Sequence, residues 1–142
     1  MSLERQVIAS FYLLLAALLS MLIGLDRERQ HKPAGMRTNM LVGVGACLFT
    51  IISIEAFPGT NDTSRVAAQI VTGIGFLGGG IIFKSKGEIH DLTTAASIWA
   101  TAAIGMTVGT GAWFLAIAAT VMTWIILSLL IKIPVKNGHP LK

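Results

Sequence analysis

Four long stretches of this 142-residue chain contain no Asp, Glu, Lys or Arg, and they constrain the fold more than any other feature of the sequence. Charged residues make up 13% of the chain, where a soluble domain carries about 25%. Long apolar stretches with so few charges are typical of a membrane protein, and they exclude secreted, fibrous and disordered classes. The uncharged stretches cover residues 6–25, 38–54, 66–83 and 92–131.

The thickness of a bilayer predicts how many times the chain crosses. A hydrocarbon core of about 30 Å needs about 20 helical residues, and about 17 suffice, so each of the first three stretches fits one crossing. The fourth would form a helix of about 60 Å and must turn back; its glycines place the turn within 108–112. We therefore predict an all-α polytopic membrane protein, a compact bundle of five helices followed by a short tail over 132–142. The predicted spans lie near 6–25, 38–54, 66–83, 91–108 and 112–131.

The distribution of Lys and Arg predicts the orientation. Nine of the eleven basic residues lie in segments 26–37, 84–91 and 132–142, which five crossings place on one side. Only Arg5 and Arg65 lie on the other side. Because basic loops stay in the cytoplasm, we expect the N-terminus outside and the tail in the cytoplasm. The net charge of +4 then reflects topology, and we expect no binding to nucleic acid.

Small residues recur along the predicted helices at a spacing of four. Small side chains let helix backbones approach closely in lipid, so the pattern predicts tight packing within the bundle or a contact face between copies. Residues 73–78 also spell the dinucleotide-binding pattern G-x-G-x-x-G, but they lack the strand and acidic residue that this site requires. Residues 78–80 leave two options open, a continuous helix or a break that lines a site. The glycines expected to pack between helices are Gly24, Gly73, Gly75, Gly78, Gly79 and Gly105.

Apart from its ends, no predicted crossing contains Asp, Glu, Lys, Arg or His. A short loop brings the first two helices together, which predicts that Arg27, Glu28 and Arg37 are joined in one charged cluster. A topology signal alone is the alternative for these charges. The few carboxylates, a single cysteine and isolated histidines predict no metal site, no cofactor and no catalytic residues, so we expect that the protein is not an enzyme.

Four ordered strings resemble the membrane domain of the MgtC/SapB family. They are IGLDRE at 23–28, AGMRT at 34–38, SRVAAQIVTGIGFLG at 64–78, and LTTAA followed by a tryptophan and AAIG within 92–105. The resemblance extends over roughly residues 10 to 130. It singles out as charged and polar candidates for function Asp26, Arg27, Glu28, Arg37, Thr38, Arg65, Gln69, Thr93 and Thr94.

The resemblance implies a multi-pass protein of the bacterial inner membrane that binds and modulates other membrane proteins. In the family this role is linked to magnesium limitation, acid stress and virulence. The alternative is a transporter or channel component for magnesium or another cation, using a glycine-interrupted third helix. The implied partners are the lipid bilayer, other membrane proteins and further copies of the chain, with a dimer as one option. Larger members add a cytoplasmic C-terminal domain similar to ACT modules, which we do not expect after the short tail at 132–142.

Overall fold

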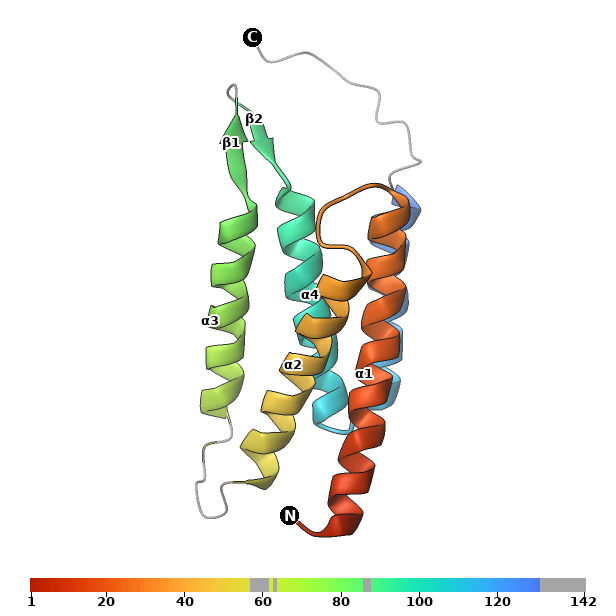
Figure 1. Ribbon diagram of the computed structural model, residues 1–142, viewed down its shortest axis with the longest axis vertical. Helices are drawn as coiled ribbons and strands as arrows, with labels where there is room; N and C mark the ends of the chain where they lie inside the picture. The colour runs from red at the N-terminus through yellow and green to blue at the C-terminus, as the bar shows by residue number, and fades with distance from the viewer. Residues whose placement is uncertain (57–61, 63, 86–87, 131–142) are drawn as a thin grey trace.

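The computed structural model of the protein describes residues 1–56, 62, 64–85 and 88–130. These residues form five helices and one small β-hairpin, which confirms the all-α class (Figure 1). The predicted tail at 132–142 lies outside the described residues. The elements are α1 (Leu3–Arg29), α2 (Met36–Glu55), α3 (Ser64–Ile81), β1 (Phe83–Ser85), β2 (Glu88–His90), α4 (Leu92–Gly109) and α5 (Trp113–Ser128).

The ends of the helices follow local sequence signals. Ser2 caps α1, where its hydroxyl accepts a hydrogen bond from the backbone N–H of Arg5. The turn between α4 and α5 falls where it was predicted, and Gly111 adopts a φ of 82° there, which glycine accommodates without strain. Three helices, α1, α2 and α4, are long and apolar enough to cross a membrane, and α5 is a shorter apolar helix.

The hairpin was not predicted. Strands β1 and β2 pair antiparallel, with Phe83 opposite His90 and Ser85 opposite Glu88. The chain needs this reversal because α3 and α4 run in opposite directions side by side (Figure 1). We call this end of the bundle the hairpin end; the N-terminus lies at the other end.

The main core lies where four helices meet. In Figure 1, α2 and α4 occupy the centre, α1 packs beside them with α5 behind it, and α3 stands at the edge. The main cluster draws on α1, α2, α4 and α5, and a smaller cluster of Ala46, Ile70 and Ala102 attaches α3. The buried residues of the main cluster are Ala16, Leu19, Cys47, Ile51, Ile104, Val108 and Ala116.

Glycines allow the central helices to touch through their backbones. A Cβ atom on Gly105 would lie 2.9 Å from the carbonyl carbon of Gly43 and 3.0 Å from its Cα, so α2 and α4 cross in direct backbone contact. A Cβ atom on Gly24 would lie 2.5 Å from Cα of Met36. At Gly24 and Gly105 the structure therefore agrees with the expectation of close packing. Gly78 makes an ordinary contact, with its added Cβ atom 3.6 Å from Cβ of Ala95.

The expectation of close packing within the chain is wrong for three glycines of α3. Cβ atoms added to Gly73, Gly75 and Gly79 would meet no described atom within 4 Å. The reason is that α3 buries only a narrow stripe, with Ile70 and Gly78 as its buried residues, and the rest of its surface faces away from the bundle. The helix is also continuous from 64 to 81, so the interruption considered at 78–80 does not occur. An intact helix keeps the backbone groups of its interior, including those at 78, hydrogen-bonded within this apolar segment.

Candidate functional site

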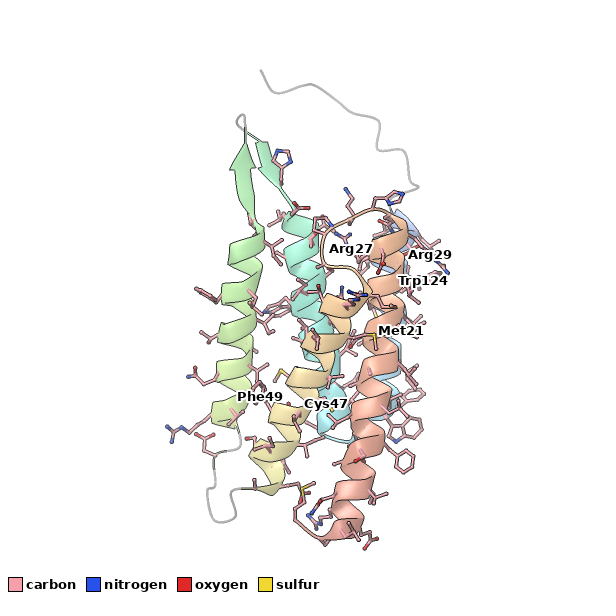
Figure 2. The ribbon with its side chains drawn as sticks, in the orientation of Figure 1. Met21, Arg27, Arg29, Cys47, Phe49 and Trp124 are labelled. Carbon is pink, nitrogen blue, oxygen red and sulfur yellow. The ribbon has the colours of Figure 1, made fainter. Side chains whose placement is uncertain are left out.

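A buried guanidinium lies between α1 and α4 at the hairpin end. Arg27 is 1% exposed, and its Nη2 donates a hydrogen bond of 2.5 Å to Oγ1 of Thr94, which is also 1% exposed. The Thr94 hydroxyl in turn donates to Oδ1 of Asp91 at 3.4 Å. Asp91 joins β2 to α4 with a φ of 60°. This chain of contacts therefore ties α1 to the base of the hairpin, and Figure 2 shows Arg27 on the side of α1 that faces α4.

A second polar chain joins α2 to α4. The buried amide of Asn39 donates from Nδ2 to the carbonyl oxygens of Ala34, at 2.6 Å, and Gly35, at 3.0 Å. Its Oδ1 lies 2.9 Å from Oγ1 of Thr101, which can donate either to it or to the carbonyl oxygen of Ser97. The amide thus holds the loop before α2 against the middle of α4.

The junction between α1 and α2 completes this end of the bundle. The carboxylate of Glu28 accepts a hydrogen bond of 3.0 Å from the backbone N–H of Met36, in the first turn of α2. A negative charge is favourable there because the first N–H groups of a helix lack partners within it. The strings at 23–28 and 34–38 therefore meet at one joint between α1 and α2. Thr94, from the string at 92–105, contacts this joint through its hydrogen bond with Arg27.

The joint holds a charge without a direct ionic partner. Arg27 is the one charged residue that is buried among the described residues, and they give it no ion pair. Its Nε is buried without a hydrogen-bond partner in the described structure, as are Oγ of Ser20 and Oε1 of Gln30. The hydroxyls of Thr94 and Thr101 and the amide of Asn39 each hydrogen-bond to fixed neighbours. The network can therefore hold the end of α1, the loop before α2 and α4 in one geometry, and keep the positive charge of Arg27 in the interior.

The structure brings two of the predicted candidates together and separates the others. Arg27 and Thr94, 67 residues apart, are in direct contact. Asp26 is half-buried and accepts a hydrogen bond of 2.7 Å from Gln30. The remaining candidates are exposed: Glu28, Arg37, Thr38, Arg65, Gln69 and Thr93.

The predicted cluster of Arg27, Glu28 and Arg37 does not form. Consecutive helical residues point about 100° apart, so Arg27 faces the interior while Glu28 faces the start of α2. Arg37 is exposed, and none of the described side chains pairs with it. The ion pair that the described residues do contain lies at the other end, where Nη1 of Arg5 is 2.7 Å from Oε2 of Glu55.

Sequence reasoning missed the roles of Thr101 and Ser97 in the network. Both recur with Gly105 and Gly109 at the spacing of four along the fourth span, and the hydroxyl of Thr101 gives no sign of a partner 62 residues away. The available signal was that Thr94 lies on the same face of this helix as Ser97 and Thr101, and three hydroxyls on one face of a buried helix need acceptors.

The outward surface of α3 is a second feature of the chain. Ala68, Thr72, Gly75 and Gly79 follow one another along one exposed line of the helix, and Phe76 beside them is 83% exposed. We call these four residues the small-residue face of α3. On the opposite side of this helix, α2 and α3 enclose a groove of about 630 Å³, lined by Leu41, Val42, Gly45, Ala46, Phe49, Val66, Gln69, Ile70, Gly73, Ile74 and Leu77.

Comparisons with known proteins identify relatives of this chain. The model of the MgtC family matches residues 13–135. "Putative magnesium transporter YhiD" of Escherichia coli K12 is 44% identical over 138 residues, covering 89% of this chain and 64% of YhiD. "Protein SrpB" of Synechococcus elongatus is 42% identical over 132 residues, covering 84% of this chain and 72% of SrpB. "Protein MgtC" of Brucella abortus strain 2308 is 50% identical over 106 residues, covering 75% of this chain and 44% of that protein. The chain thus spans less than two thirds of YhiD and less than half of that MgtC protein. No solved structure matches the chain.

Proposed function

The chain belongs to the MgtC family, and from this premise we propose that it is a regulatory protein of the bacterial inner membrane that binds and modulates other membrane proteins. The family resemblance links this role to magnesium limitation, acid stress or virulence. In this proposal the chain acts by docking onto helices of its partners and is not an enzyme.

The observation that carries the proposal is the open small-residue face of α3. Gly75 and Gly79 form a G-x-x-x-G pair, yet Cβ atoms added to them would touch no described atom of the chain. Small residues at this spacing let two helix backbones pack closely in lipid. Because the chain itself does not use the pair, a helix of another membrane protein, or of a second copy, can occupy it.

The groove between α2 and α3 supports the same proposal. Its lining is almost entirely apolar, and Gln69 at its rim supplies an amide for hydrogen bonding. In lipid, polar side chains at helix contacts add specificity to a contact that close packing stabilises. This groove lies on the side of α3 opposite the small-residue face, so it would take a separate segment of a partner.

The proposed membrane arrangement has five crossings, with the N-terminus outside and the hairpin end in the cytoplasm. Three helices meet the length and composition of a membrane span, and α3 and α5 run alongside them. The excess of Lys and Arg on the hairpin side supports this orientation. The buried network around Arg27 would then lie at the cytoplasmic end, beneath the hairpin.

Cation transport is the second candidate, and the printed name of YhiD is the observation that favours it. Three features of the chain weigh against it. The third helix is continuous, α2 and α4 touch through their backbones at Gly43 and Gly105, and the buried Arg27 would repel a divalent cation at the hairpin end.

Leucine substitutions on α3 test the docking proposal. Gly75→Leu and Gly79→Leu should leave the free energy of unfolding in detergent close to that of the parent, because both sites are open, and should abolish capture of partner membrane proteins. Gly80→Leu is the matched control, since it is also open but points about 100° away from Gly79. Partners would be captured by in-cell crosslinking under low magnesium and identified by mass spectrometry.

Two results would contradict the proposal. One is the same set of crosslinked partners in all three leucine variants and the parent. The other is uptake of Mg²⁺ by proteoliposomes of the purified parent at a rate above that of empty vesicles, which would favour transport instead.

A further inference from the structure

A cleft between α1 and α5 opens on the outside of the bundle near the hairpin end. Its volume is about 330 Å³, within the range of roughly 300–1,000 Å³ typical of ligand sites. The buried Thr120 forms part of its floor, and the exposed side chains of Leu22 and Val121 form its walls. Because this cleft lies on the far side of α1 from the network around Arg27, it is a separate feature of the molecule (Figure 2).

Two opposite charges lie at the rim of this cleft without pairing with each other. Asp26 and Arg29 are three residues apart on α1, so they share one side of the helix, yet no ion pair joins them. The guanidinium of Arg29 is exposed and makes no hydrogen bond or ion pair with any described residue. Asp26 is held in place by Gln30, which donates to its Oδ2 at 2.7 Å and to the carbonyl oxygen of Leu127 on the α5 side at 3.3 Å.

A tryptophan completes the rim. Trp124 of α5 is 41% exposed and lies beside Arg29 in Figure 2. Tryptophan is enriched where membrane helices meet the headgroup layer, because its ring is apolar and its N–H is polar. Below it, Leu22 and Val121 continue the cleft toward the middle of the bundle with exposed apolar side chains. The cleft therefore offers charges at headgroup level and an apolar surface at acyl-chain level.

We propose that this cleft is a binding site for phosphatidylethanolamine. Arg29 binds the phosphate, Asp26 accepts hydrogen bonds from the ammonium group, and one acyl chain lies against Leu22, Val121 and Trp124. A headgroup with a phosphate and an ammonium group matches a rim with one positive and one negative charge, and the ammonium of ethanolamine, unlike the methylated nitrogen of choline, has N–H groups that can donate to Asp26. Phosphatidylglycerol lacks the ammonium group and would leave Asp26 facing an anion. The site rests on the proposed placement of the bundle in a bilayer.

Quenching of tryptophan fluorescence by brominated lipids tests the site directly. The double variant Trp99→Phe, Trp113→Phe leaves Trp124 as the one tryptophan of the chain. In phosphatidylcholine nanodiscs, brominated phosphatidylethanolamine should quench Trp124 at a mole fraction about fivefold lower than brominated phosphatidylglycerol, the factor expected for one favourable charge contact at a membrane surface. Equal quenching by the two lipids would overturn the proposal.

Charge variants in this background identify the contacts. Asp26→Asn retains an acceptor for Gln30 and should remove the preference for phosphatidylethanolamine. Arg29→Gln should weaken quenching by both lipids about fivefold. Arg37→Gln, an exposed arginine away from the cleft, is the matched control and should change neither value. An unchanged preference in Asp26→Asn would refute the assignment of the ammonium site.

Brominated phosphatidylcholine separates failure of the site from failure of the membrane placement. If all three brominated lipids quench Trp124 equally, the bundle lies in the bilayer and the headgroup site is wrong. If none of them quenches Trp124, the placement of the bundle is wrong and the site falls with it.

Discussion

The contact between Arg27 and Thr94 allows a sharp test of the buried network. Thr94→Val keeps the volume and branching of the side chain but removes the hydroxyl that accepts from Nη2 of Arg27 and donates to Asp91. Both Arg27 and Thr94 are 1% exposed, so water cannot easily replace the lost acceptor. The neighbouring substitution Thr93→Val makes the same chemical change at an exposed site and is the matched control.

The expected cost follows from the two hydrogen bonds. A bond to a charged group contributes about 1.5–3 kcal/mol, whereas neutral bonds between membrane helices average about 0.6 kcal/mol. The contact from Arg27 has a charged donor, and the contact to Asp91 is long at 3.4 Å. We therefore expect Thr94→Val to lower the free energy of unfolding by about 2 kcal/mol. Thr93→Val should change it by less than about 0.5 kcal/mol.

Reversible unfolding by sodium dodecyl sulfate in mixed micelles, followed by circular dichroism, measures both values. A second substitution distinguishes loss of the bond from poor packing of valine. Arg27→Met removes the buried charge, and apolar replacements of buried charges are often neutral. The double variant Arg27→Met, Thr94→Val should therefore be more stable than the sum of the single effects by at least about 1 kcal/mol. Equal stability of Thr94→Val and Thr93→Val, or strict additivity in the double variant, would refute the reasoning.

Three further predictions concern packing, charge and orientation. Gly105→Ala should destabilise the bundle by about 1–3 kcal/mol because its methyl group would meet the backbone of α2. Gly45→Ala, the control at an open site of α2, should be neutral or stabilising by up to about 1 kcal/mol. The same unfolding assay compares the two variants. Arg37→Ala should leave the yield of folded protein in membranes unchanged, since none of the described side chains pairs with this arginine; a large fall in yield would show a role in folding. In intact cells, a membrane-impermeant maleimide should label Asp62→Cys and not Lys32→Cys, and the reverse pattern would invert the proposed orientation.

The helical class and the approximate helix bounds could be predicted from the sequence because they depend on local properties. Bilayer thickness sets the length of an uncharged run, and the excess length of 92–131 requires a turn. The turn was found correctly because Gly111 is suited to a positive φ. The string at 23–28 also contains Gly24, whose missing side chain lets Met36 approach, so a local motif pointed to a real contact.

The tertiary structure alone decided which faces of the helices are used. Gly75 and Gly105 look alike in the sequence, but α4 lies at the centre of the bundle and α3 at its edge, so one glycine contacts a backbone and the other faces outward. Arg27 turns inward because Thr94, on a helix 67 residues later, offers an acceptor there. Hydropathy and spacing describe one helix at a time, whereas these outcomes depend on which helices become neighbours and on the angle at which each one faces the others.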